Sequence, residues 1–290
     1  MAVPLRSASW QTEIKPGAGD NFTKAAFSLW LDDAAPPPDA LLVITPGWNG
    51  DGRAEINSPR WQTFARENRL GLIGVFLQSE ERDDIPPYHA AQMGSGAAFL
   101  NAVTRLSKEA GRPSLANAPL LFWGHSAGGQ FGYGMACYAP TRVAAFAAIK
   151  GGVYLSKPVP GTYAVPGIFI VGEQDEVGRA MNITWLFETG RIQRAPWCLA
   201  FELDRGHEQG RANALILPFF RGVLALGRRT ANQSNKNTSM APGTLLGVRS
   251  SLALLKGTDS KGIEPQRTVW LPDTLTAKAW QVFSGGVEPP

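Results

Sequence analysis

From residue 40 onward, short apolar runs alternate with longer segments in which apolar residues recur every three or four positions. Short runs without polar alternation are typical of strands buried on both faces, and the longer period is typical of helices. The predicted strands are 40–45, 71–77, 118–124, 143–150, 166–172 and 197–203, and the predicted helices are 58–69, 90–111, 127–138, 178–194 and 212–229. Repeated strand–helix–strand units form a mostly parallel central sheet with helices on both faces, so we predict an α/β fold.

Two features refine the start of this pattern. The segments "SASWQTEI" (7–14) and "KAAFSLWL" (24–31) alternate between apolar and polar residues, as antiparallel edge strands do. The first helix carries Ser58 at its cap position and Pro59 in its first turn, where proline is favoured.

The C-terminal part has a different composition. Residues 230–242, "TANQSNKNTSMAP", are polar and predict a flexible loop. The later segment "TVWLPDTLTAKAWQVF" (268–283) predicts a short helix capped by Asp273. Its inward-facing residues are expected to be Leu275, Ala279, Trp280 and Phe283. We therefore predict a main domain over 1–229, and a loop with a docked C-terminal appendage over 230–290.

Charge and composition argue against a nucleic-acid partner and against a membrane-spanning segment. The 290 residues include 28 Lys and Arg against 24 Asp and Glu, a net charge of +4, and no basic run is longer than Arg228-Arg229. We therefore expect no nucleic-acid partner. No apolar run reaches the roughly 18 residues of a membrane span, and the first residues lack the apolar stretch of a signal peptide. A mature secreted chain would look the same, so the compartment stays open, as does the oligomeric state.

Two cysteines, Cys137 and Cys198, lie inside predicted apolar elements. They could form one disulfide or remain two buried thiols, and the sequence does not decide between these. With two cysteines and three histidines, no zinc-ligand spacing appears, so we expect no metal site.

One serine stands out in "LLFWGHSAGGQ" (120–130). Ser126 lies between Gly124 and Gly128, after a predicted strand and before a predicted helix. The Gly-x-Ser-x-Gly pattern is weak by itself, but at this junction it predicts a strained turn that presents the hydroxyl as a nucleophile. The alternative is a glycine-rich cap of an ordinary helix.

A serine nucleophile needs a base, and three histidines could serve. His207, in "ELDRGHEQG", follows the last predicted strand, and the loops after parallel strands share one sheet edge with the serine. We therefore predict His207 as the base. His125 adjoins the serine, but neighbouring side chains diverge at such a turn, and His89 is expected to be a capping or surface residue.

The base needs a carboxylate to orient it. "FIVGEQDEVG" follows the strand before that of His207 and offers Glu173, Asp175 and Glu176. Asp175 lies far enough into its loop to turn back toward the histidine, so we predict it as the acid. Asp204 is the competitor, but it is too close to His207 in sequence to orient it easily.

Backbone donors for a developing oxyanion are expected from two places. One is the N–H of Ala127, which opens the helix after the serine. The other is the loop "VITPGWNGDG" (43–52), where Trp48 is the main candidate and Asn49 the second, unless the loop is a plain glycine-rich turn. The residues expected to line the substrate site are Asn49, His125 and Trp123.

Together, "GHSAGG", "GEQDEV", the Gly-His pair at 206–207 and "PGWNGDG" resemble the α/β-hydrolase superfamily over about residues 40–228. The last loop is similar to that of the polyester depolymerase and feruloyl-esterase branch. This resemblance implies a serine carboxylic ester hydrolase without a cofactor, acting on a small-molecule or polymeric ester.

The interval between the strands 143–150 and 166–172 is only about fifteen residues, too short for a large helical lid, so we expect an open site. A serine peptidase on the same fold and a non-catalytic binding protein are the alternatives.

Overall fold

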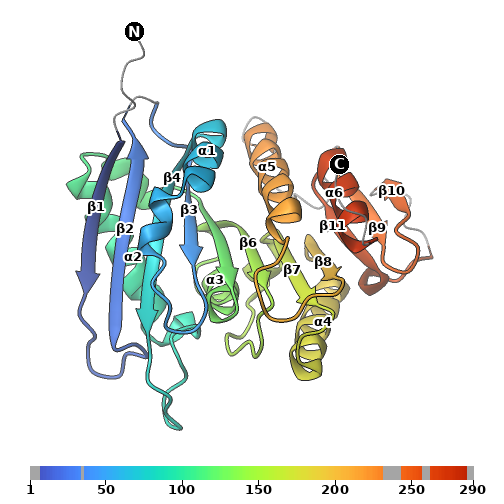
Figure 1. The fold of residues 1–290 in the computed structure, drawn as a ribbon, viewed down its shortest axis with the longest axis horizontal. Helices are drawn as coiled ribbons and strands as arrows, with labels where there is room; N and C mark the ends of the chain where they lie inside the picture. The colour runs from blue at the N-terminus through green and yellow to red at the C-terminus, as the bar shows by residue number, and fades with distance from the viewer. Residues whose placement is uncertain (1–6, 34–35, 231–242, 257–261, 286–290) are drawn as a thin grey trace. The chain divides into compact units, whose positions relative to one another are not determined.

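The computed structural model describes residues 7–33, 36–230, 243–256 and 262–285 (Figure 1). The chain divides into two compact units. Unit 1 comprises Met1–Val143 and Tyr154–Lys157, and unit 2 comprises Ala144–Val153 and Pro158–Pro290.

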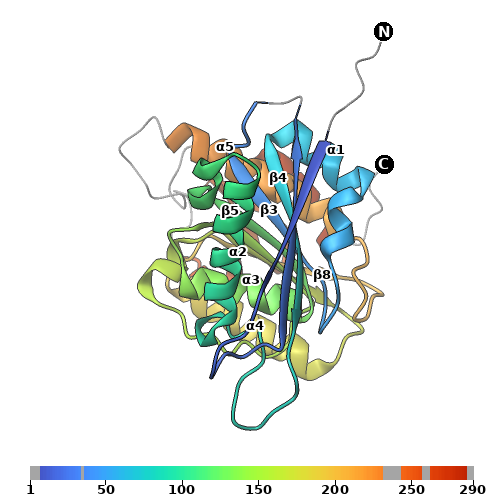
Figure 2. The ribbon, with the colours of Figure 1, turned by 90° about the vertical axis from the view of Figure 1, so that its left-hand side faces the viewer.

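Unit 1 contains a five-stranded array in the order β1-β2-β4-β3-β5. Its elements are β1 (Ser7–Ile14), β2 (Lys24–Asp32), β3 (Ala40–Thr45), α1 (Pro59–Asn68), β4 (Leu70–Gln78), α2 (Ser95–Glu109), β5 (Leu120–His125) and α3 (Ala127–Tyr138). Strands β1 and β2 form a long antiparallel pair, as their alternation predicts (Figure 2). Strand β3 runs parallel to both β4 and β5.

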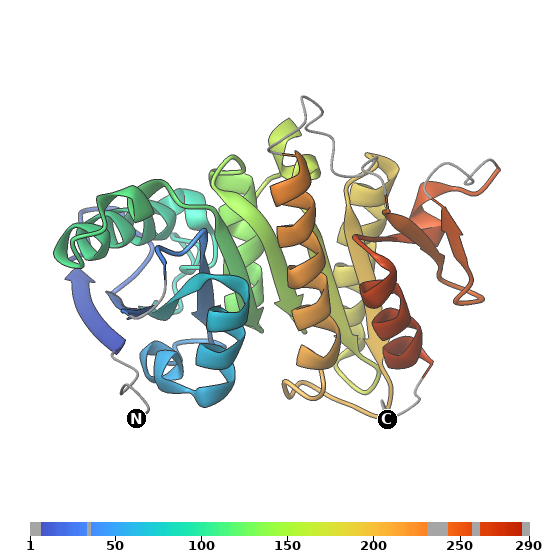
Figure 3. The same cartoon turned by 90° about the horizontal axis from the view of Figure 1, so that it is seen from above.

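The apolar runs form the centre of unit 1 because they are covered on both sides. All six residues of β3 are buried, and Val43 lies in register between Ile73 and Phe122 of the flanking strands. Figure 3 shows α1 on one side of these strands and α2 on the other. The helix α1 begins at Pro59 after Ser58, as predicted, although the Ser58 side chain makes no capping hydrogen bond.

Unit 2 contains three parallel strands: β6 (Val143–Ile149, without its first residue), β7 (Gly167–Gly172) and β8 (Trp197–Glu202). The helices α4 (Val177–Ile192) and α5 (Asn213–Thr230) lie on opposite faces of them (Figure 3). Between β6 and β7 the only helical segment of the described chain is one short 3-10 turn, Pro160–Ala164, so no helical lid is inserted there. The predicted α/β fold, with its mostly parallel strands and antiparallel N-terminal pair, is confirmed.

The C-terminal segment of unit 2 forms a small antiparallel sheet, β10-β9-β11, and a helix. Its elements are β9 (Leu245–Val248), β10 (Leu254–Lys256), β11 (Thr268–Leu271) and α6 (Thr274–Ser284). The Trp280 indole N–H donates to the Leu199 carbonyl of β8 at 3.0 Å. Arg191 of α4 donates to the Thr268 carbonyl at 3.0 Å, and burial lowers its pKa to about 10. These bonds hold the small sheet and its helix against β8 and α4.

Three details of the C-terminal prediction are settled by the structure. Asp273 caps α6, because its side chain accepts a 2.7 Å hydrogen bond from the Thr276 amide. Leu275 was expected to face inward, but it is 73% exposed, and Ala277 of the same helix is buried instead. The sequence analysis also missed the strands β9, β10 and β11, which are only three or four residues long.

The predicted helix 90–111 begins later than expected, at Ser95. Gly94 has φ +121, and a Cβ there would lie 2.2 Å from the Asp20 carboxylate, so this glycine breaks the helical backbone at a tight contact. Residues 231–242 of the predicted flexible loop lie outside the described residues, and the domain boundary at 229–230 stays a prediction.

Cys137 and Cys198 are both free and buried, so they are the two thiols rather than a disulfide. None of the helices in the described part of the chain has both the length and the hydropathy of a membrane-spanning segment. No group of three or more His, Cys, Asp or Glu side chains in those residues could hold a metal ion.

Candidate functional site

Ser126 occupies a strained turn between β5 and α3. Its backbone lies at φ 53 and ψ −123, a region that residues with a Cβ rarely adopt and that costs about 1–3 kcal/mol. The two flanking glycines permit this turn. A Cβ on Gly124 would lie 2.2 Å from the Gly128 backbone, and a Cβ on Gly128 would lie 2.2 Å from the Thr45 carbonyl. The pattern read from the sequence is therefore a structural requirement of the turn.

The loop after β3 lies directly beside this serine. A Cβ on Gly47 would be 3.6 Å from the Cβ of Ser126. A turn closed by the Gly50 amide on the Gly47 carbonyl, at 3.0 Å, places Trp48 and Asn49 at its two central positions. Asn49 has φ 53, and its side chain exchanges two hydrogen bonds with the backbone of Ser79, at 3.0 and 2.9 Å. This side chain therefore fixes the loop.

The other predicted donor, Ala127, is the first residue of α3, where N–H groups have no acceptor within the helix. The assignment of Ala127 and Trp48 as oxyanion donors stays a prediction.

The Trp48 side chain is 40% exposed and stacks on Tyr88, with ring centroids 5.6 Å apart. The Tyr88 hydroxyl in turn donates to the Gly47 carbonyl at 3.5 Å. His89 meets the Trp48 ring edge-on at 6.5 Å. We expected His89 at a cap or on the surface, but it is only 7% exposed, because the aromatic residues around the loop enclose it.

Burial gives His89 a measurable effect on stability. Its pKa falls to about 4, because desolvation penalises the imidazolium, whereas an unfolded histidine titrates near 6.5. As the pH falls from about 6.5 to 4, the unfolded chain takes up the proton first, so the free energy of unfolding should decrease, by up to about 3 kcal/mol. Denaturant titrations of the wild type and of His89→Gln at pH 7, 5.5 and 4 check this. Other acids contribute equally to both proteins, so parallel pH curves for the pair would contradict the prediction.

Two predicted substrate residues lie at different depths. Trp123 is 3% exposed and packs edge-on against Trp61 with centroids 5.3 Å apart, so it is a core residue rather than an accessible substrate contact. His125 is half-buried at the end of β5, and a Cβ on Gly47 would lie 3.5 Å from its Nδ1. Its role in binding substrate stays a prediction.

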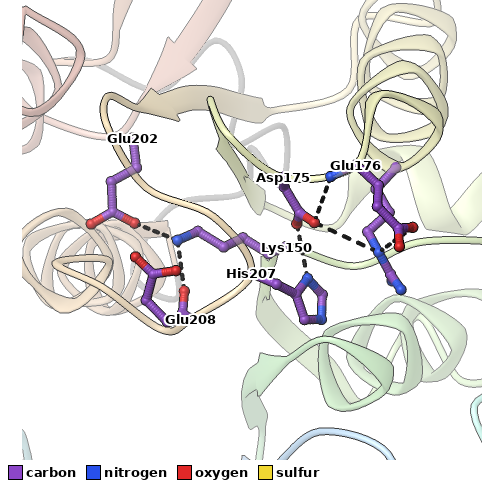
Figure 4. Close-up of polar contacts among 7 residues, drawn as sticks. Lys150, Asp175, Glu176, Glu202, His207 and Glu208 are labelled. Carbon is purple, nitrogen blue, oxygen red and sulfur yellow. Dashed lines mark hydrogen bonds and ion pairs between the residues drawn. The ribbon is translucent and has the colours of Figure 1, made fainter.

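In unit 2 the structure brings Asp175 and His207 together. The His207 Nδ1 lies 2.8 Å from the Asp175 Oδ2, and the carboxylate is 4% exposed against 38% for the imidazole (Figure 4). The second oxygen of Asp175 accepts from the Glu176 amide at 2.8 Å and lies 3.7 Å from the Arg179 guanidinium. These contacts hold the carboxylate on the ring nitrogen, while the ring itself still reaches solvent.

Two of the competing carboxylates, Glu173 and Glu176, are engaged elsewhere. Glu176 pairs with Arg179 at 3.1 Å. Glu173 accepts from the backbone amide of Asp204 at 2.9 Å, and Asp204 has φ 55. The pairing of His207 with Asp175, rather than with Asp204, is therefore the one predicted from the sequence.

The sequence analysis missed three charged residues of this site: Lys150, Arg179 and Glu202. Lys150 and Glu202 form an ion pair of 2.8 Å with both side chains 0% exposed (Figure 4). A signal for them existed, because each is a charged residue at the end of a strand predicted to be fully buried. Arg179 gave no such signal, because it is an ordinary arginine in the first turns of a helix.

No family model and no curated protein matches the chain. Several solved structures are similar to it. An S-formylglutathione hydrolase from Agrobacterium tumefaciens has a TM-score of 0.53 at 13% identity, over 77% of this chain and 97% of that one. A ferulic acid esterase has a TM-score of 0.53 at 10% identity, over 76% of this chain and 99% of that one. The fluorophosphonate-binding serine hydrolase F of Staphylococcus aureus has a TM-score of 0.50 at 12% identity, over 75% of this chain and 98% of that one. The chain therefore has the α/β-hydrolase fold that these three hydrolases share.

Proposed function

We propose that the chain is a serine hydrolase that cleaves carboxylic esters through an acyl-enzyme intermediate. The observation that carries this proposal is the strained backbone of Ser126 between two glycines that admit no side chain. Strain of this kind persists where it presents a reactive group, and a plain helix cap does not need it. The buried Asp175 paired with His207 supplies the second half of the chemistry.

In the proposed mechanism, the Ser126 hydroxyl attacks the ester carbonyl while His207 takes its proton. Asp175 holds the ring so that Nδ1 carries a proton and Nε2 is left to act as the base, and it stabilises the imidazolium that forms. The backbone amides of Ala127 and Trp48 donate hydrogen bonds to the tetrahedral oxyanion.

The imidazolium then gives its proton to the departing alcohol, which leaves the acyl group on the serine. A water molecule, deprotonated by the same imidazole, attacks the acyl-enzyme, and the imidazolium then returns the proton to the Ser126 oxygen as the acid leaves. The chemistry requires the loops after β5, β7 and β8 to act together, and parallel strands bring their following loops to one edge.

We further propose that the substrate is a bulky or polymeric ester. The short interval between β6 and β7 carries no helical lid, and Trp48, whose backbone amide is a proposed oxyanion donor, is 40% exposed. One structurally similar protein is a ferulic acid esterase, so an ester of ferulic acid belongs among the substrates to be screened.

A paired assay tests this function. We expect the purified chain to hydrolyse p-nitrophenyl esters and a suspended polymeric ester, to leave a matched peptide p-nitroanilide intact, and to react with a fluorophosphonate. Comparable cleavage of the anilide would indicate a serine peptidase instead. A folded chain that neither hydrolyses an ester nor reacts with the fluorophosphonate would be a non-catalytic protein.

A further inference from the structure

A buried ion pair lies beneath the loop that carries His207. Lys150 directly follows β6, and Glu202 is the last residue of β8. Their charged groups are 2.8 Å apart, and neither side chain has any exposed surface (Figure 4). Removing two charges from water is costly, and a well-packed apolar pair is often at least as stable. The stability of the fold therefore does not explain why this pair is present.

Lys150 reaches past its partner to the main chain of the loop. Its Nζ donates a 2.6 Å hydrogen bond to the carbonyl of Glu208, the residue directly after His207 (Figure 4). Lys150 itself adopts φ 51, an uncommon conformation for a residue with a side chain. One ammonium group thus joins the end of β6 to the loop 203–212 between β8 and α5, which carries His207 and is called the base loop below.

Glu202 holds the same loop three residues further on. One of its carboxylate oxygens accepts a hydrogen bond from the backbone amide of Arg211. Gly210 has φ +54, and a Cβ there would lie 2.3 Å from both carboxylate oxygens. The chain therefore wraps closely over this carboxylate, and only glycine fits at that point.

The part of the base loop before His207 is bound to the acid loop, which is the segment 173–176 between β7 and α4 that carries Asp175. The Glu173 amide donates to the Glu202 carbonyl at 3.0 Å, and the Gln174 amide donates to the Arg205 carbonyl at 2.8 Å. The Asp204 amide donates to the Glu173 side chain at 2.9 Å. These bonds fix the chain before the imidazole, and the buried ion pair fixes it after the imidazole. The imidazole itself is 38% exposed.

We propose that Lys150 and Glu202 are positioning residues that hold the main chain after His207, so that the imidazole stays on Asp175 in the orientation needed for proton transfer. They act through the loop and do not touch the substrate. An apolar pair would fill the same space but could neither donate to the Glu208 carbonyl nor accept from the Arg211 amide. The catalytic part of this inference rests on the proposed function, whereas the effect on the His207–Asp175 pair does not.

The test compares two charge-free double variants. Lys150→Met/Glu202→Met removes the buried pair without leaving either charge unpaired. Arg249→Met/Glu188→Met is the matched control, because Arg249 likewise joins a carboxylate at 2.7 Å and a backbone carbonyl, that of Gln266 at 2.9 Å, away from the base loop. The readouts are the low-field proton NMR signal of the His207–Asp175 hydrogen bond, kcat and KM on a p-nitrophenyl ester, and the thermal midpoint.

We expect the buried-pair variant to lose or broaden the low-field signal and to lower kcat by about 10- to 100-fold, with KM changed less than about twofold. The control variant should keep the low-field signal and the wild-type kcat. The control variant and the buried-pair variant should each melt cooperatively. An unchanged signal and an unchanged kcat in the folded buried-pair variant would overturn the inference. If the wild type hydrolyses no ester but the signal is lost in that variant alone, the positioning role stands and the proposed function fails.

If the buried-pair variant does not fold, the positioning role of Lys150 and Glu202 is tested by a milder variant and by hydrogen exchange in the wild type. Glu202→Gln keeps the shape of the side chain and an acceptor for Arg211, and it should reduce kcat by a smaller factor. In the wild type, the Arg211 amide should exchange with deuterium as slowly as the amides of β7. Rapid exchange of this amide in the intact protein would show that the loop is not held, and would overturn the inference.

Discussion

Replacing Ser126 with alanine is expected to lower kcat for ester hydrolysis by about 10⁵- to 10⁶-fold and to abolish reaction with a fluorophosphonate. The methyl group keeps the Cβ, so the strained backbone at φ 53 is strained equally in both proteins. The free energy of unfolding should therefore change by less than about 1 kcal/mol, and the loss of rate can be assigned to the missing hydroxyl. The rate is measured with a p-nitrophenyl ester, and labelling is followed by intact-protein mass.

Ser58→Ala is the matched control for this variant. Both serines occupy helix N-cap positions, and neither side chain caps its own helix. The control should keep full activity and full labelling. If Ser126→Ala hydrolysed the ester or reacted with the fluorophosphonate as well as the wild type does, a different residue would be the nucleophile and the assignment would be overturned.

The second large effect is expected at the acid. Asp175→Asn should lower kcat by about 10⁴-fold, or roughly 5 kcal/mol in barrier, with little change in KM. The asparagine amide has the same shape, but toward Nδ1 it can offer an N–H in place of an oxygen. The histidine would then carry its proton on Nε2, where a proton acceptor is required. Steady-state kinetics on the same ester measure the effect.

Asp204→Asn provides the comparison, because Asp204 is the competing carboxylate in the same pair of loops. Asparagine tolerates the φ of 55 found there, and it is the Asp204 backbone amide that bonds Glu173. This variant should stay within about twofold of the wild type. If Asp204→Asn lost more activity than Asp175→Asn, the acid would have been assigned to the wrong residue.

Much of the fold could be predicted because its signals are local. A run such as "ALLVIT" has no polar position, so it fits only a strand covered on both faces, and β3 is buried throughout. Helix starts were predicted where a fixed φ or a cap marks them, as at Pro59 and Asp273. The prediction failed at Gly94, because the reason for the break is a contact with Asp20, which is remote in sequence.

The candidate site divides in the same way. Ser126, Asp175 and His207 could be named because each follows a strand whose end the pattern locates. The environments of His89, Trp123 and Leu275 could not be predicted, since burial depends on what other elements place around a side chain. Asn49 was expected at the substrate, but its side chain bonds Ser79 from a neighbouring strand end.

Up to residue 229, the sequence by itself determined the order of strands and helices, the strained turn at the serine and the candidates for base and acid. These follow from short-range sterics and from the period of apolar residues, which neighbouring positions suffice to fix. Only the tertiary structure decided that Asp175 meets His207, and that Lys150 and Glu202 meet beneath the base loop. Such contacts join separate strands, so they depend on register and packing across the sheet rather than on any local segment.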